Sequence, residues 1–306
     1  MPPSRRLDRA GSARDSVQVR TSTNAAAGPT FSVARFVERV HTLGPGAGSA
    51  IHQRLPDGRI TLVFRVLDES RGGDVCVAGP RRRALFKKLD GVERAVVLQF
   101  KPGWSVPLFG VPAKALTDQI VPLEHIWGCP GGSLFTELLA APSLADLIER
   151  ISHAITSREH TYEPASARLA RRAVHLLEHG EVRVERVAEQ LGVTARHIRR
   201  AFSEHIGIGP KEFARTVRLK RAVELSATSN DWVHIAADAG YYDQAHLIAE
   251  FRELIGLTPV SFQKRTNPPH IRPDPHRHAL EQPGLPRSKR SDERQLDTHA
   301  GRIPAG

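Results

Sequence analysis

Short apolar runs alternate with turn-forming strings over residues 31–130. The runs include RITLVFRVL, DVCVAG and AVVLQF, and the strings between and around them include PDG, RGGD and KPGW. Apolar runs of this length, bounded by Gly, Pro and Asp, are typical of β-strands. The pattern predicts a small β-sheet or β-barrel for this part of the chain.

The hydrophobic period becomes helical at Pro142. In PSLADLIERISHAI, Ser143 stands where it can cap a helix, and an apolar stripe follows at helical spacing. A stripe of this kind is most often core, but it could also join two copies of the chain. We therefore interpret residues 131–163 as a helical linker and a candidate dimer helix. The stripe consists of Leu144, Leu147, Ile148, Ile151 and Ile155.

Residues 164–266 are predicted to be helical and contain an internal repeat. HIRRAFSEHIGIGPKEF and HLIAEFRELIGLTPVSF begin at residues 197 and 246, and each has an apolar stripe, a Gly that can end a helix and a Pro that can begin the next. A second short helix, VERVAEQLG or VHIAADAG, precedes each copy. Helix, tight Gly turn and helix is the helix-turn-helix pattern, so two such motifs are expected.

The second helix of the first motif carries a basic face. Arg196, Arg199 and Arg200 are spaced i, i+3 and i+4 and project opposite the apolar stripe. The planar fork of arginine can bond guanine O6 and N7 together, which suits it to base recognition. A solvated charged face is the ordinary alternative, but three arginines without interleaved acids on this helix favour DNA.

Charge and composition limit the class of protein. Lys and Arg number 44 against 33 Asp and Glu, and the net charge of +11 suggests an anionic partner. The sequence lacks the roughly 18 consecutive apolar residues of a membrane helix and has no apolar signal segment, so a cytoplasmic protein is expected. Residues 1–30 and 267–306 are rich in Pro, Gly, Ser and charge and are predicted to be disordered tails.

Histidines and cysteines do not suggest a catalytic or metal site. The histidines of the front half form no H-x-H pair and have no Glu at metal spacing, and those of the tail could bind a metal but have no second ligand group around them, so a solvated tail is favoured. The two cysteines, Cys76 and Cys129, lie far apart without the neighbours that activate a thiol. We expect no enzyme activity, no metal and no cofactor. The histidines considered are His41, His52 and His125 in the front half and His270, His276 and His278 in the tail.

The residues of the two helix-turn-helix motifs resemble a known family. VAEQLGVTARHIRRAFSEHIGIGP and IAADAGYYDQAHLIAEFRELIGLTPVSFQKR are similar to the DNA-binding domain of AraC/XylS-type transcriptional regulators. The resemblance implies that the second helix of each motif enters the major groove of double-stranded DNA. It gives as base-reading residues Arg196, Arg199, Arg200, Gln244 and His246, with Ala245 and Ala249 at matching positions. Ala249 departs from the family, which usually has Arg there. Predicted phosphate contacts are Thr194, Arg215, Arg218, Lys220, Arg221 and Arg252.

The front half is similar to the cupin-like sensor half of one group of these regulators, on turn-rich strings such as PDG, GP and FKPG. The expected fold is therefore α+β, with a cupin-like small β-barrel or sheet at residues 31–130 and an all-α domain with two helix-turn-helix motifs at 164–266. Two uses of the front half stay open. Its interior could hold a mostly apolar small-molecule effector, or it could be filled and serve dimerisation alone.

We expect a sequence-specific transcription regulator that binds promoter DNA and responds to an unknown small molecule. RNA polymerase and a second copy of the chain, as a homodimer, are candidate partners. The alternatives are an architectural DNA binder and a DNA-repair regulator whose front half senses no ligand.

The two motifs predict unequal reading of DNA. The second helix of the second motif keeps its apolar stripe, but it has Ala245, Ile248 and Ala249 where the first motif has its three arginines. We expect the first motif to read a short, G-containing half of the site and the second to add little base information.

Overall fold

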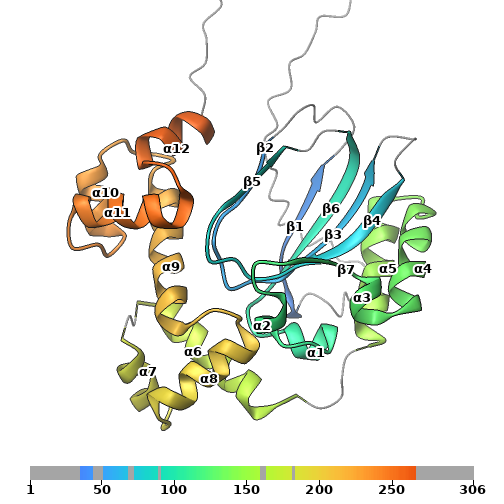
Figure 1. Ribbon diagram of the computed structural model, residues 1–306, viewed down its shortest axis with the longest axis horizontal. Coiled ribbons are helices and arrows are strands. Elements are labelled where there is room, and N and C mark those ends of the chain that lie inside the picture. Colours follow the sequence, from blue (N-terminus) through green and yellow to red (C-terminus); the bar gives the residue numbers. More distant parts are fainter. Residues whose placement is uncertain are drawn as a thin grey trace, which may run out of the picture. The chain divides into compact units, whose positions relative to one another are not determined.

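The computed structural model describes residues 35–43, 51–67, 72–88, 91–158, 163–180 and 183–266 (Figure 1). The chain divides into two compact units, Met1–Gln263 and Lys264–Gly306. The two predicted tails and the three tail histidines lie outside the described residues. An antiparallel sheet region is followed by helices, so the predicted α+β class is confirmed.

The front half contains two antiparallel sheets in its described part. The larger has the strand order β1-β6-β3-β4-β7, and β2 pairs with β5 in a separate ladder. The sheet expected from the apolar runs is therefore present, as open sheets and not as a closed barrel. The strands are β1 (Val37–Leu43), β2 (Ile51–Arg54), β3 (Thr61–Leu67), β4 (Gly73–Ala78), β5 (Leu85–Lys88), β6 (Val92–Phe100) and β7 (Ile120–Pro122).

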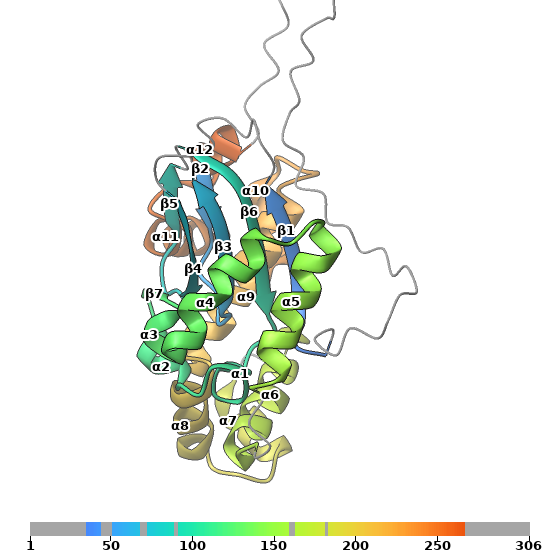
Figure 2. The same cartoon turned by 90° about the vertical axis from the view of Figure 1, so that its right-hand side faces the viewer.

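Alternation along the strands gives the large sheet two different faces. Leu62 of β3 lies opposite Leu98 of β6, and both are fully buried in one core with Phe64. Five helices contribute to this side of the sheet region, and Figure 2 shows α4 and α5 lying across the face nearest the viewer. They are α1 (Ser105–Phe109), α2 (Ala113–Leu116), α3 (Glu124–Trp127), α4 (Cys129–Leu139) and α5 (Leu144–Thr156).

Helix α5 follows the expected cap, Ser143, and its apolar stripe packs against the core of the same chain. The side chain of Ser143 accepts a hydrogen bond from the backbone N–H of Asp146. Leu147, Ile151 and Ile155 are almost completely buried in the sheet core. A dimer seam through these side chains, one of the two uses expected from the sequence, is therefore not available, because the stripe already packs on the protein's own sheet.

The second half is helical and has two hydrophobic cores, one for each motif. The tight turns inside the motifs fall at Gly192 and Gly240, whose φ angles of 64° and 84° favour glycine. Phe202 and Phe251 occupy matching buried positions. The helices are α6 (Ala165–Glu178), α7 (Val184–Gln190), α8 (Ala195–His205), α9 (Pro210–Leu225), α10 (Trp232–Asp238), α11 (Gln244–Ile255) and α12 (Pro259–Thr266).

Hydrogen bonds within the unit Met1–Gln263 connect the sheet region to both motifs. The Thr117 hydroxyl donates to the Gly207 carbonyl at the end of α8 (2.8 Å), and the Ala84 N–H donates to the Leu254 carbonyl of α11 (2.8 Å). No helix among the described residues is long and apolar enough to cross a membrane.

Candidate nucleic-acid interface

Helix α8 presents an arginine face to solvent. Arg196, Arg199 and Arg200 are exposed, whereas Ile198 and Phe202 of the same helix are fully buried. Arg199 donates to the carboxylate of Glu185 on α7 (2.9 Å), and both side chains are more than half exposed. An exposed ion pair of this kind contributes little stability, so another anion can replace Glu185 as the partner of Arg199. The three arginines expected from the sequence therefore lie together on one accessible face.

The start of α8 is fixed by Thr194. Its side-chain oxygen accepts a hydrogen bond from the backbone N–H of His197 (3.2 Å), which caps the helix. Asp243 does the same for α11, where its carboxylate accepts from the N–H of His246 (2.7 Å). The hydroxyl proton of Thr194 can still be donated to a phosphate, whereas the capping carboxylate of Asp243 can only accept.

The exposed face of α11 is largely uncharged. Gln244, Ala245 and Ala249 are exposed, and Ile248 is half-buried. The ring of His246 stands edge-on to the buried ring of Tyr241, with 5.4 Å between centroids, and its Nε2 lies 3.9 Å from a Glu250 oxygen. Contacts with Tyr241 and Glu250 thus restrict the His246 ring. Gln244 is the more accessible of the two residues of α11 that are predicted to contact bases.

A buried ion-pair cluster docks α11 on α9. The carboxylate of Glu250, only 7% exposed, accepts from Arg215 (2.7 Å) and from Arg218 (2.8 Å), and Glu253 accepts a further bond from Arg215 (2.5 Å). Hydrogen bonding to Glu253 raises the pKa of Arg215 and lowers the pKa of Glu253 itself. Arg215 and Arg218 were predicted to contact phosphate. In the structure their guanidinium groups form ion pairs with the carboxylate of Glu250.

The other predicted phosphate contacts do not gather in one place. Lys220 and Arg221 line a cavity beside β1 and β2, and Lys220 lies 3.9 Å from Glu224 one turn further along α9. Arg252 is exposed in the last turn of α11. Only Thr194 and Arg252 of the six therefore belong to the exposed surface of the two second helices.

Tyr242 is a surface residue that the sequence reasoning missed. It immediately precedes the cap of α11 and is 93% exposed. The matching residue of the first motif, Val193, is half-buried against its core. The Tyr-Tyr pair in the turn was the available signal, because only one of the two rings can enter the core.

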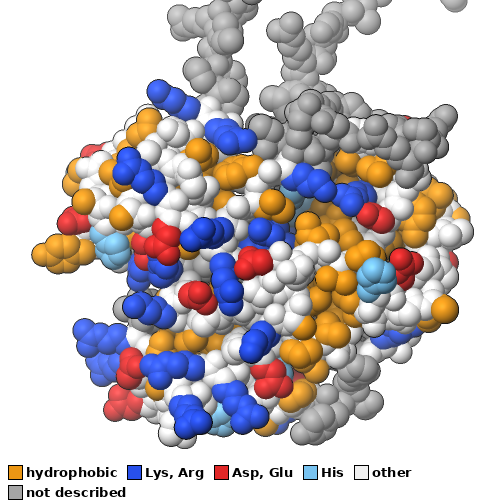
Figure 3. Space-filling model, viewed as in Figure 1, with side chains coloured by type: hydrophobic (Ala, Val, Ile, Leu, Met, Phe, Trp, Pro, Cys, Tyr) orange, Lys and Arg blue, Asp and Glu red, His pale blue; other side chains and the backbone are white. Residues whose placement is uncertain are grey.

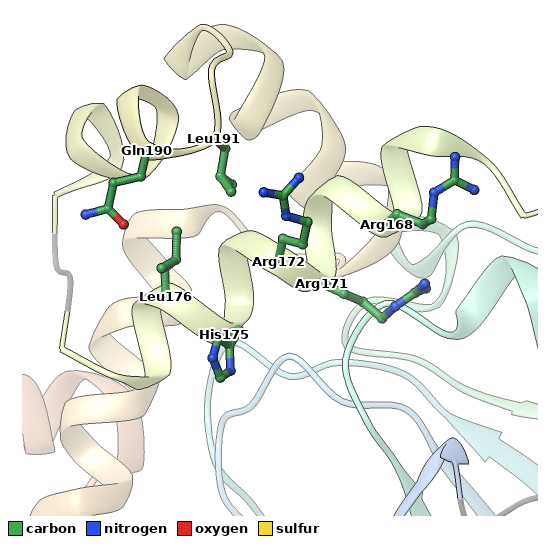
Figure 4. Close-up of a pocket in the computed structure, with 7 residues that line it drawn as sticks. All are labelled: Arg168, Arg171, Arg172, His175, Leu176, Gln190 and Leu191. Carbon is green, nitrogen blue, oxygen red and sulfur yellow. The ribbon is translucent and has the colours of Figure 1, made fainter.

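Basic residues extend from α8 to α6. In Figure 3, Lys and Arg side chains gather over the region that Figure 1 labels α6, α7 and α8. A groove of about 630 Å³ lies here. Figure 4 shows Arg172 directed toward Leu191 and Arg171 directed away from it. The guanidinium of Arg171 stacks on the ring of Trp104, 4.2 Å from the ring centroid. The groove is lined by Arg168, Arg171, Arg172, His175, Leu176, Gln190 and Leu191.

A second candidate site is a cavity of about 740 Å³ between the sheet region and α9. Figures 1 and 2 place α9 on the side of the sheet opposite α4 and α5. Residues of β1, β2, β3 and β6 form one wall, and Thr216, Val217, Leu219 and Lys220 of α9 belong to the other.

Thiol and metal chemistry find little support among the described residues. Burial raises the pKa of the Cys76 thiol to about 11, so it stays protonated at neutral pH. Within the described part of the chain, no group of three His, Cys, Asp or Glu side chains could hold a metal ion. Cys76 therefore lacks the thiolate character that alkylation repair requires.

Two family models match parts of the chain. Residues 187–265, from α7 into α12, match the model described as a helix-turn-helix domain, and residues 26–122 match a domain of unknown function (DUF6597). The first match covers both motifs and the helix between them, and the second covers most of the sheet region.

Curated relatives share the helical half. An uncharacterized HTH-type transcriptional regulator of Haemophilus influenzae is 33% identical over 82 residues, which cover 26% of this chain and 28% of the relative. The HTH-type transcriptional activator RhaS of Escherichia fergusonii is 32% identical over 76 residues, covering 24% of this chain and 27% of the relative. The matches thus span about a quarter of the length of these relatives.

Similar solved structures were found for parts of the chain. An AraC-type transcriptional regulator from Chromobacterium violaceum is 25% identical, with 34% of this chain and 96% of that chain covered and a TM-score of 0.32. ToxT from Vibrio cholerae O395 is 10% identical, with 75% of this chain and 97% of that chain covered and a TM-score of 0.41.

Proposed function

We propose that this chain, whose carboxy-terminal part is the AraC-type helix-turn-helix domain of a transcription regulator, binds promoter DNA in a sequence-specific manner and responds to a small molecule. The observation that carries the proposal is the exposed arginine face of α8. Arg196, Arg199 and Arg200 stand on the second helix of a helix-turn-helix motif, which is the helix that enters the major groove.

The arginines supply base recognition in this proposal. Each well-placed bidentate pair with guanine discriminates against a wrong base by about 1–3 kcal/mol. Gln244 and His246 are the base-reading groups of α11, and Ala245 and Ala249 contact thymine methyl groups. Contacts from Thr194 and Arg252 to phosphate add affinity without sequence information.

The cavity between the sheet region and α9 is the proposed effector site. Its volume of about 740 Å³ lies within the range of small-molecule sites. It borders α9, which joins the two motifs and holds α11 through Glu250. An effector in this cavity therefore contacts the helix on which the spacing of the two motifs depends. Nothing in the described residues points to RNA polymerase or to a second copy of the chain as a partner.

Selection of binding sites from random double-stranded DNA tests the DNA-binding proposal. The full chain should enrich a site with a G-containing half, and Arg200→Ala should lower the preference for that site over random DNA. Lys114→Ala is a matched control, because Lys114 is exposed on α2 in the sheet region. Recovery of no preferred sequence by the unaltered protein would favour an architectural DNA binder.

A further inference from the structure

The chemistry of the cavity wall differs from what the apolar strands suggest. Leu62, Phe64 and Leu98 point to the core beneath α4 and α5. The alternate positions of the same strands, Thr61 and Gln99, line the cavity instead. Because side chains alternate between the two faces of a strand, the apolar positions that predicted an apolar pocket are used for packing. Most of the residues that line the cavity are polar or charged, and apolar side chains such as Leu55, Val97 and Leu219 lie among them.

Charges on the wall do not balance. All four of its carboxylates already face a cation. Glu38 and Glu178 both pair with Arg59, the Arg59–Glu178 distance being 2.9 Å. Asp57 lies 3.6 Å from Arg54, and Glu224 lies 3.9 Å from Lys220. The lining cations that form no ion pair with a described residue are Arg39 of β1 and Arg221 of α9.

One buried hydrogen-bond donor near these cations has no acceptor among the described residues. The Nε of Arg54 is buried and has no hydrogen-bond partner among the described residues, although another nitrogen of the same group donates to the Arg59 carbonyl. A buried donor without an acceptor destabilises the protein, and an anionic ligand would supply the missing acceptor. His41 and His52 bring further ring nitrogens to the wall.

We propose that the effector of this site is a small hydrophilic anion, carrying a carboxylate or phosphate group, that binds between Arg39 and Arg54 on the strands and Arg221 on α9. The inference rests on the proposed function, because it names the chemical class of the effector of that same cavity. A ligand with a long apolar chain is disfavoured, since part of its tail would desolvate charged groups without pairing them.

The two histidines give the site a dependence on pH. Burial and then Arg39 lower the pKa of His41, and burial, Arg54 and His41 lower the pKa of His52. Both are therefore neutral in the free protein near pH 7. The charged groups that line the cavity with them are Glu38, Arg39, Arg54, Asp57, Arg59, Glu178, Lys220, Arg221 and Glu224, and Lys87 of β5 lies opposite His52 in the β2–β5 ladder.

A bound anion raises the pKa of each histidine, so binding takes up protons. Linkage then requires that the anion binds more tightly as pH falls toward the histidine pKa values. Uptake of one proton per bound anion makes the affinity increase tenfold for each unit that the pH falls, so an average uptake of half a proton gives an increase of about tenfold between pH 8 and pH 6.

Titration calorimetry of the full chain with inorganic phosphate and, separately, with succinate tests the proposal. At least one anion should bind saturably below about 10 mM, and the stronger of the two identifies phosphate or carboxylate as the preferred group. Arg39→Gln with Arg221→Gln should weaken that binding by at least about tenfold, since two uncompensated charges are lost. Lys114→Gln, an exposed lysine outside the cavity, should leave it unchanged.

Three results would overturn the inference. They are the absence of saturable binding of both anions, binding that the Arg39 and Arg221 changes leave intact, and tighter binding of oleate that these anions do not displace. DNA binding without anion is measured on the same preparations. If DNA binding by the unaltered protein fails, the proposed function fails. If Arg221→Gln alone weakens DNA binding as much as Arg200→Ala, Arg221 serves DNA and the anion site is wrong.

Discussion

The first and second helix-turn-helix motifs have the same interior and different exteriors. Both have a tight turn at a glycine, a side-chain cap at the second helix and a fully buried phenylalanine, Phe202 or Phe251. On the surface, three exposed arginines of α8 correspond to Ala245, Ile248 and Ala249 of α11. Conserving the core of a motif thus preserves the position of a helix without preserving what that helix recognises.

The means of attachment also differs between the motifs. Glu250, on the second helix of the second motif, is buried against Arg215 and Arg218 of α9. The matching position of the first motif is Ala201, which is buried in an apolar core. Arginines of α9 therefore hold the second motif in place through a buried ion pair, whereas the arginines of the first motif lie on its exposed surface.

Removal of the Glu250 carboxylate should have the largest effect on stability, because it removes the buried ion pairs that only the second motif has among the described residues. Glu250→Ala leaves two cations facing each other in a buried site, so we expect a loss of about 3–5 kcal/mol in the free energy of unfolding. Urea denaturation followed by circular dichroism measures this. Glu253→Ala is the control, because that carboxylate is about half exposed and should cost less than about 1 kcal/mol.

Loss of an α8 arginine should have the next largest effect, on binding and not on stability. Arg200→Ala should lower the preference for the selected site over random DNA by about tenfold to a hundredfold, as expected for one bidentate base contact. Gel-shift titrations with both DNAs measure the ratio. Equal or larger losses from Gln244→Ala would show that the second motif is the main reader.

Restoring an arginine to α11 would sharpen the comparison. Ala249 is exposed at the position that matches Arg200, so Ala249→Arg should tighten DNA binding several-fold and add a base preference in the second half of the site. Repeated site selection with the variant detects the new preference. An unchanged selected sequence would mean that α11 does not lie in a groove.

The two helix caps should give the smallest and most equal effects. Thr194→Ala and Asp243→Ala each remove one side-chain acceptor at a helix start, which costs about 1 kcal/mol. Urea denaturation should give similar losses for both. A much larger loss for one cap would contradict the equivalence of the two interiors.

Local patterns were sufficient to predict the two motifs. The caps, the glycine turns and the buried stripes depend on residues within one or two helical turns of each other, so spacing alone locates them. The pairing of Glu250 with Arg215 joins residues 35 positions apart, and no local pattern signals it. The strand pattern likewise showed that alternate residues are apolar, but it could not show which face of the sheet the helices cover.

The α5 stripe illustrates the same limit. Its spacing correctly predicted an amphipathic helix beginning at Ser143, but periodicity is identical for a helix that packs on its own sheet and one that packs on a second chain. Only the burial of Leu147 and Ile151 in the sheet core distinguishes the two cases.

The pairing of β1 with β6 has a consequence for how the chain folds. Leu43 is opposite Ala95, and Val37 is opposite Phe100, so this ladder joins residues more than fifty positions apart. Contacts between helices of the second half join residues that are closer in sequence, such as Arg215 and Glu250, which are 35 positions apart. Since chain closure over long separations slows folding, the carboxy-terminal helices should acquire protection from hydrogen exchange before the sheet does. The helices that follow the sheet region in the chain would then reach their native form before it does.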